Sequence, residues 1–110
     1  MIKNLKKILN LHQLKNKIIF EKNKNKKIIH CHGVFDLLHI GHIKYFQAAK
    51  KAGDFLIVSI TSDQYVNKGL ARPLFNQNLR AEMISSLEIV DAVYINDSTT
   101  AVNLIALVKP

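Results

Sequence analysis

The side chains best suited to chemistry stand in one stretch, Gly33-Val34-Phe35-Asp36-Leu37-Leu38-His39-Ile40-Gly41-His42. His39 and His42 are three residues apart, so a helix starting there would point both imidazoles toward one ligand. Gly41 lies between them and has no Cβ, which would let a phosphate approach the backbone closely. Imidazoles placed in this way would donate hydrogen bonds to the α- and β-phosphates of a nucleoside triphosphate while pyrophosphate is displaced.

This stretch lies between two segments that would position it. Residues 28–31 form a short apolar run that leads to Gly33, which predicts a buried strand followed by a turn. Residues 41–52 carry apolar side chains at helical intervals, and Gly53 suits the position after a helix end. A helix that starts at the carboxyl end of a strand offers free N–H groups and a positive dipole to phosphate.

The rest of the chain continues the alternation of strands and helices. Residues 55–61 predict a strand covered on both faces, and residues 62–78 a loop with a short helical turn at 64–66. A helix over 79–88 capped by Asn78, a strand over 92–95 and a last helix over 101–108 should follow. The predicted fold is α/β, a Rossmann-like parallel sheet with helices on both faces. It reads as C-terminally incomplete, because a fourth strand would be expected after the last helix.

The formal charge of +8 is concentrated at one end of the chain. Residues 1–27 hold nine lysines against Glu21, whereas residues 28–110 hold seven cations and seven acids. We therefore divide the chain into a basic N-terminal part, residues 1–27, and a nucleotide-binding domain, residues 28–110. An amphipathic helix over residues 2–16 and a polar connector from Glu21 to Lys27 are expected in the first part. The neutral second part disfavours a nucleic-acid partner.

Composition also bounds the compartment and the type of site. No apolar run approaches the roughly 20 residues of a membrane helix, and residues 1–14 lack the continuous apolar core of a secretory signal, so we expect none. A single cysteine, Cys31, fits a reducing compartment, so we expect a cytoplasmic protein without a membrane partner. His30, Cys31 and His32 raise the alternative of a zinc site. Successive strand residues point to opposite faces, which favours Cys31 as a core residue instead.

Read as G-x-F-D-L-L-H-x-G-H, residues 33–42 resemble the signature of the cytidylyltransferase-like superfamily. This superfamily includes glycerol-3-phosphate cytidylyltransferase and the heptose 1-phosphate adenylyltransferase domain of ADP-heptose synthase. The resemblance covers about residues 27–110, and its Lys68-Gly69 and Arg72-Pro73 pairs favour the heptose type. The nucleotidyltransferase fold of the HxGH type is what it implies. Family members continue into a fourth strand and a further base-binding motif.

The resemblance implies roles for individual residues. Val34 and Phe35 would contact the nucleotide through backbone atoms, and Asp36 would fix the loop. Lys68 would clamp the triphosphate or the acceptor phosphate. The full expected set has catalytic residues His39, His42 and Lys68, nucleotide-binding residues Gly33, Val34, Phe35, Asp36, His39, Gly41, His42 and Lys44, acceptor-binding residues Lys68, Arg72 and Arg80, and no metal ligand among the side chains.

The implied reaction transfers a nucleoside monophosphate from ATP or CTP to a sugar 1-phosphate, with Mg²⁺ screening the phosphates and pyrophosphate leaving. Glycerol phosphate or a related polyol phosphate, with CTP, is the second choice. His39 to His42 also spells the H-I-G-H motif of class I aminoacyl-tRNA synthetases, but those enzymes are several times longer and need a second lysine-rich loop. A non-catalytic nucleotide-binding or assembly module is the alternative of a different class. A homodimer and a sugar-kinase domain or partner are the candidate protein partners.

Overall fold

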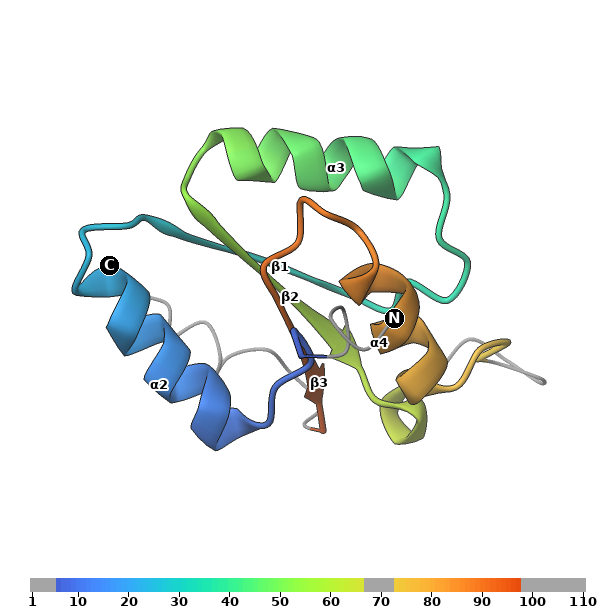
Figure 1. Cartoon of the computed structure of the whole chain (residues 1–110). Coiled ribbons are helices and arrows are strands. Elements are labelled where there is room, and N and C mark those ends of the chain that lie inside the picture. The colour runs from blue at the N-terminus through green and yellow to red at the C-terminus, as the bar shows by residue number, and fades with distance from the viewer. Residues whose placement is uncertain (1–5, 67–72, 98–110) are drawn as a thin grey trace.

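A computed structural model describes residues 6–66 and 73–97 of the chain. Helices and strands alternate along most of this length (Figure 1). In chain order the elements are α2 (Leu11–Lys22), β1 (Ile28–Gly33), α3 (Ile40–Lys51), β2 (Phe55–Thr61), the 3-10 turn η1 (Asp63–Tyr65), α4 (Gln77–Ser85) and β3 (Ala92–Asn96). Among the described helices, none is long and apolar enough to cross a membrane.

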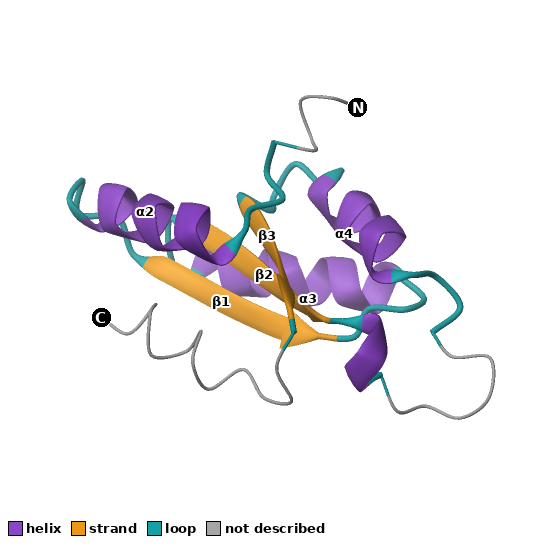
Figure 2. Cartoon of the chain, turned by 90° about the horizontal axis from the view of Figure 1, so that it is seen from below, coloured by secondary structure: helices purple, strands orange, loops and turns teal. Residues whose placement is uncertain are grey.

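The three strands form one parallel sheet in the order β1-β2-β3. Helices α3 and α4 lie on one side of this sheet and α2 lies on the other (Figures 1 and 2). The predicted Rossmann-like α/β fold is therefore confirmed. Because all strands run in one direction, their carboxyl ends meet at one edge, where the loops that follow β1 and β2 come together.

Strand β2 contributes to the hydrophobic cores on both faces of the sheet. All its residues from Phe55 to Ile60 are buried, as expected for the middle strand of a sheet covered on both faces. Leu56, Val58 and Ile60 pack toward α3 and α4, while Phe55 and Ile57 pack toward α2. Cys31 is buried in the first of these clusters, which confirms its predicted place in the core.

Within the described residues, the predicted helix over 2–16 is wrong, and so is the start of the predicted connector at Glu21, which is a buried helical residue. The helix runs from Leu11 to Lys22 instead, and Asn10 caps it by accepting the Gln13 N–H at 2.8 Å. The Gln13 side chain returns the interaction by accepting the Asn10 N–H at 2.9 Å, and this capping box fixes the start of the helix. Ile8, predicted to be helical, forms a parallel bridge to Val93 at the edge of β3. Its burial comes from strand pairing, which helical periodicity cannot reveal.

The other described boundaries agree with the prediction to within a few residues, and the largest shift of a whole helix among them is at α4. This helix starts at Gln77 because Asn76, rather than Asn78, caps it by accepting the Leu79 N–H at 2.9 Å. It ends at Ser85, three residues earlier than predicted. The Ser85 hydroxyl donates to the Glu82 carbonyl at 2.8 Å, a local bond that competes with helix continuation. The predicted helix over 101–108 lies outside the described residues.

Candidate functional site

The start of α3 is built by the two histidines of the motif. His39 is the N-cap residue, and its Nδ1 accepts the Gly41 N–H at 3.0 Å. His42 occupies the third helical position, and its Nδ1 accepts the His39 N–H at 3.1 Å. The two rings lie 4.0 Å apart between centroids. Each imidazole therefore satisfies one of the backbone donors left free at a helix start, in the reciprocal pattern of a capping box.

These contacts determine which nitrogen of each imidazole carries the hydrogen. A backbone N–H is always a donor, so the Nδ1 that receives it must carry no proton. A neutral imidazole then holds its hydrogen on Nε2, on the far side of the ring. Burial and the neighbouring His39 ring both lower the pKa of His42, which favours this neutral form. With Nδ1 used in this way, each neutral ring carries its hydrogen on Nε2, and an imidazole N–H can donate to an oxygen.

Phe35 lies in the turn that follows β1, residues 34–36, which we call the motif turn, and its backbone conformation is unusual. Its φ is +51°, in the left-handed region that side chains other than glycine seldom adopt. Its ring packs edge-on against His42 at 5.3 Å and against Phe46 at 5.2 Å, between centroids. A Cβ at Gly33 would lie 2.8 Å from the Phe35 ring, so glycine makes room for this packing. The Phe35 ring therefore packs the turn against the hydrophobic core and against His42.

Asp36 ties the motif turn to a segment far away in sequence. Its two carboxylate oxygens accept the N–H groups of Leu74 and Phe75 at 2.8 and 2.9 Å. The bound segment is 38 residues away from Asp36 at its nearest. The sequence pattern could not predict this contact, because the donors are backbone N–H groups and the side chains of Leu74 and Phe75 take no part in it.

Arg80 does not occupy the position expected of an acceptor-binding residue. Its side chain is fully buried, and it donates to the carbonyls of Val34, Thr61 and Phe75 and to the carboxylate of Asp63. The predicted contact with an acceptor needs a guanidinium that reaches solvent. In this structure Arg80 instead joins the loops at the carboxyl edge of the sheet.

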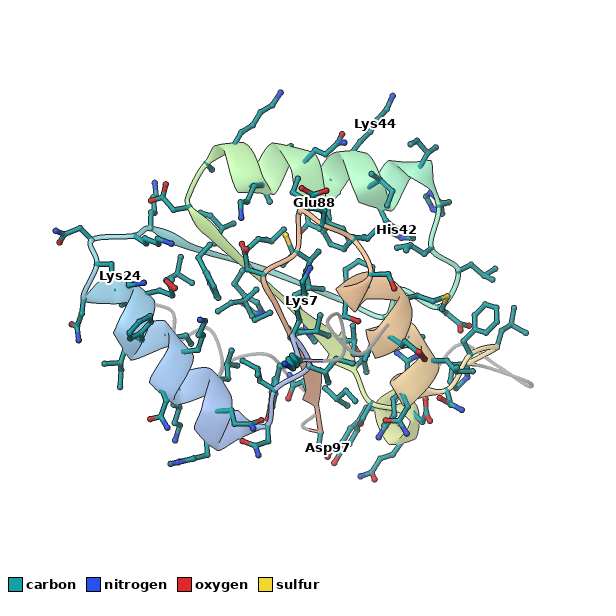
Figure 3. The ribbon with its side chains drawn as sticks, in the orientation of Figure 1. Lys7, Lys24, His42, Lys44, Glu88 and Asp97 are labelled. Carbon is teal, nitrogen blue, oxygen red and sulfur yellow. The ribbon has the colours of Figure 1, made fainter. Side chains whose placement is uncertain are left out.

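Other predicted site residues are separated from this cluster or fall outside the description. Lys44 extends from the outer side of α3, whereas His42 lies on the side that faces the turn (Figure 3). Lys68 and Arg72 lie outside the described residues. Gly41 does lie between the two histidines, but a Cβ there would be 2.7 Å from Cε1 of His39. Its first effect is thus to admit the His39 ring.

A polar cluster that the sequence did not predict lies on the α2 side of the sheet. Ser59 is fully buried, and its hydroxyl is 2.7 Å from Nε2 of His30 and 2.6 Å from Nδ1 of His32. Burial, followed by the neighbouring His32, lowers the pKa of His30 to about 4, and burial also lowers that of His32. The indication in the sequence was the spacing of His30 and His32, because residues two apart in a strand point to the same face. Within the described ranges, no group of three or more His, Cys, Asp or Glu side chains is placed to hold a metal ion.

Comparison with known proteins agrees with this geometry. The family model described as cytidylyltransferase-like matches residues 30–110. A protein named bifunctional protein HldE from Geobacter metallireducens is 44% identical over 106 residues, covering 94% of this chain and 22% of that protein. Its namesake from Campylobacter fetus subsp. fetus is 48% identical over 87 residues, or 77% of this chain and 19% of that protein. The chain thus spans about a fifth of the length of these relatives.

A solved structure shows the same fold. The lipopolysaccharide core biosynthesis protein from Thermoplasma volcanium superposes with a TM-score of 0.66 at 34% sequence identity, covering 77% of this chain and 70% of that one. The family match begins within β1 and includes the motif turn, both histidines and the whole of α3. With its fold, its motif and its sequence in agreement, the chain belongs to the cytidylyltransferase-like family of nucleotidyltransferases.

Proposed function

We propose that this chain binds the triphosphate of ATP or CTP at the start of α3 and supports transfer of the nucleoside monophosphate to a sugar 1-phosphate. The observation that carries the proposal is the pair of Nδ1 atoms engaged by the backbone of the same helix start. This engagement leaves both Nε2–H groups as donors for phosphate oxygens. The fold supports it too, because ligands of parallel α/β sheets bind outside the carboxyl ends of the strands.

The proposed reaction is an in-line displacement. An oxygen of the acceptor phosphate attacks the α-phosphorus and forms a new P–O bond, while the bond between the α-phosphorus and the bridging oxygen breaks and releases pyrophosphate. The acceptor oxygen is already anionic, so no side chain has to remove a proton from it. His39 and His42 would donate hydrogen bonds to the phosphate oxygens as negative charge builds up, an electrostatic contribution from a preformed site.

Further cations would complete the site. Lys68 as a phosphate clamp and Arg72 as its assistant stay predictions from the family resemblance. Mg²⁺ would screen the triphosphate charge when the nucleotide is bound. The Asp36 carboxylate already accepts two N–H groups and Asp63 pairs with Arg80, so the nucleotide phosphates and water would supply most of the magnesium ligands.

A sugar 1-phosphate is our first choice of acceptor, and glycerol phosphate or another polyol phosphate the second. The similarity to a lipopolysaccharide core biosynthesis protein supports a sugar acceptor, and ATP is favoured over CTP by the heptose-type resemblance. Relatives are named bifunctional, so a second activity accompanies this domain in them. We propose that a sugar kinase, as a domain or a separate chain, supplies the phosphorylated acceptor.

The direct test is pyrophosphate release from ATP or CTP with a panel of sugar 1-phosphates and glycerol 3-phosphate. The wild-type chain is compared with His42→Ala and with a control, His12→Ala, whose side chain is exposed on α2. Loss of one transition-state donor should lower the rate about 10²- to 10³-fold in His42→Ala and leave the control unchanged. Equal release by wild type and His42→Ala would refute the proposed role. Nucleotide binding without any release would favour a non-catalytic binding module.

A further inference from the structure

Arg80 is the only arginine in the described ranges, and it is buried at the point where the loops of the candidate site meet. Its Nη1 donates to the Val34 carbonyl at 2.9 Å and to the Thr61 carbonyl at 2.6 Å. Its Nε donates to the Phe75 carbonyl at 2.9 Å, and its Nη2 donates to Asp63 Oδ1 at 2.7 Å. One side chain therefore joins the motif turn, the end of β2, the turn η1 and the segment before α4.

Only a guanidinium can make this set of bonds. Its planar fork presents five N–H donors from three nitrogens, whereas a lysine ammonium is a single point with three donors. Three of the four acceptors are backbone carbonyls, which keep their orientation only while a donor remains in place. A side chain with fewer or differently placed donors would leave at least one of these carbonyls without its partner, so the arrangement is specific for arginine.

The hydrogen bond from Arg80 to the Val34 carbonyl restrains the peptide between Val34 and Phe35, the two residues whose backbone is expected to contact the nucleotide. In a trans peptide the C=O and the following N–H point in opposite directions. By holding the Val34 carbonyl inward, Arg80 directs the Phe35 N–H away from itself and restrains the peptide that precedes the left-handed residue. A bulky residue stays in the left-handed region only when its surroundings over-determine the conformation.

The restraint continues from Phe35 to the histidines. The Phe35 ring contacts His42 edge-on, so the position of the turn sets where His42 can lie. A second route runs through Phe75, whose carbonyl accepts from Arg80 and whose N–H donates to Asp36. Both ends of the motif turn, Val34 and Asp36, are therefore connected to the same buried side chain.

We propose that Arg80 is a positioning residue for the nucleotide: held inside the protein, it sets the peptide between Val34 and Phe35, and through the Phe35 ring it sets His42. It touches neither the nucleotide nor the acceptor. This inference rests on the proposed function for its consequence, weaker nucleotide binding, but the geometry of the turn can be tested without a ligand.

The test uses Arg80→Lys, which keeps the charge, and Arg80→Gln, which keeps two N–H donors without it. The matched control is Lys50→Met, which removes the partly buried ion pair with Asp91 elsewhere in the chain. Folding is checked by circular dichroism, and all comparisons are made well below the unfolding temperature. The measurements are the backbone amide and His42 imidazole NMR signals without ligand, and the dissociation constant for ATP and CTP.

A positioning role predicts that the amide signals of Val34 to Asp36 and the ring signals of His42 move in Arg80→Lys and Arg80→Gln and stay in place in Lys50→Met. The nucleotide dissociation constant should rise about 10-fold or more in the Arg80 variants alone. Unmoved signals, or unchanged affinity in a folded Arg80 variant of a chain that binds nucleotide, would overturn the inference. If the wild-type chain binds neither nucleotide, the proposed function fails, while the ligand-free signals still decide the role of Arg80.

The wild-type chain gives an independent answer should both Arg80 variants fail to fold. The Nε–H signal of Arg80 should exchange slowly with water in the ligand-free protein, because it is buried and donates to Phe75. Addition of ATP should leave this exchange slow. Fast exchange without ligand, or a shift of Arg80 to a phosphate contact on nucleotide addition, would contradict an internal positioning role.

Discussion

His42 accepts the backbone N–H of His39 through Nδ1 at 3.1 Å, so the second histidine of the motif caps the first. His39 in turn uses Nδ1 to accept the N–H of Gly41 at 3.0 Å. The helix start therefore selects the same tautomer for both rings, with the hydrogen on Nε2. The two histidines of the motif therefore form a helix cap, and the proposed phosphate site would use the ring nitrogens that the cap leaves unused.

Replacement of Gly41 by alanine should separate the role of His39 in capping the helix from its proposed role in binding phosphate. The added methyl group would lie 2.7 Å from Cε1 of His39, so the ring must move. Alanine also favours a helix over glycine by about 1 kcal/mol, which offsets part of the stability lost in the clash. We expect ATP affinity, measured by calorimetry, to fall about 10-fold, with little change in the unfolding temperature.

The control for this substitution is Ile40→Ala, which truncates a side chain that is 67% exposed on the same helical turn. It should leave ATP affinity unchanged. Full ATP affinity in Gly41→Ala would show that the position of the His39 ring does not matter for binding.

Stability should fall in acid because of the cluster around Ser59. Burial lowers the pKa of His30 from 6.5 to about 4, so the folded chain binds fewer protons there than the unfolded chain. Its contribution is fully present above about pH 6.5 and is lost as the pH falls through 4. We expect His30 to account for about 1–3 kcal/mol of the decrease in unfolding free energy between pH 7 and pH 4.

Urea titrations at pH 7, 5.5 and 4 measure this contribution. His30→Gln keeps a hydrogen-bonding group beside Ser59 but does not titrate, so its stability should depend less steeply on pH. Parallel pH profiles for wild type and His30→Gln would show that His30 titrates normally in the folded chain.

The Asp36 carboxylate should matter for stability more than an ordinary surface acid. It accepts two backbone N–H groups, and the single amide oxygen of Asp36→Asn would leave one of them poorly satisfied. The expected cost is about 1–3 kcal/mol of unfolding free energy in urea at pH 7. Asp54→Asn is the matched control, because Asp54 is exposed and one of its oxygens accepts the Lys27 N–H. A loss no larger in Asp36→Asn than in Asp54→Asn would contradict this role.

The sequence predicted the sheet and the helix α3 well for a physical reason. Residues 55–61 are mostly apolar and rich in β-branched side chains, and the apolar side chains of residues 41–52 recur at helical spacing, so local pattern and tertiary burial agree there. The N-terminal helix was misplaced because Ile8 and Leu9 fit two patterns. Their burial comes from contact with Val93, a residue far away in the chain that no local window includes.

The candidate site was predictable only in part. The spacing of His39 and His42 identified the helix start, and the same spacing also matches a capping box with imidazoles in place of the usual side chains. Arg80 was assigned to the acceptor site because the family resemblance implies that role for it. Its partners in the structure are the carbonyls of Val34, Thr61 and Phe75 and the carboxylate of Asp63, and contacts with backbone carbonyls cannot be read from residue types.

The most direct test of a phosphate site at His39 and His42 is a calorimetric titration of the chain with ATP and CTP at neutral pH. The wild-type chain, His39→Ala, His42→Ala and the exposed-histidine control His12→Ala are compared. We predict saturable binding of at least one nucleotide by wild type and His12→Ala, and affinity reduced about 10-fold or more in each of the other two variants. Equal affinity in all four chains, or no binding by wild type, would contradict the site.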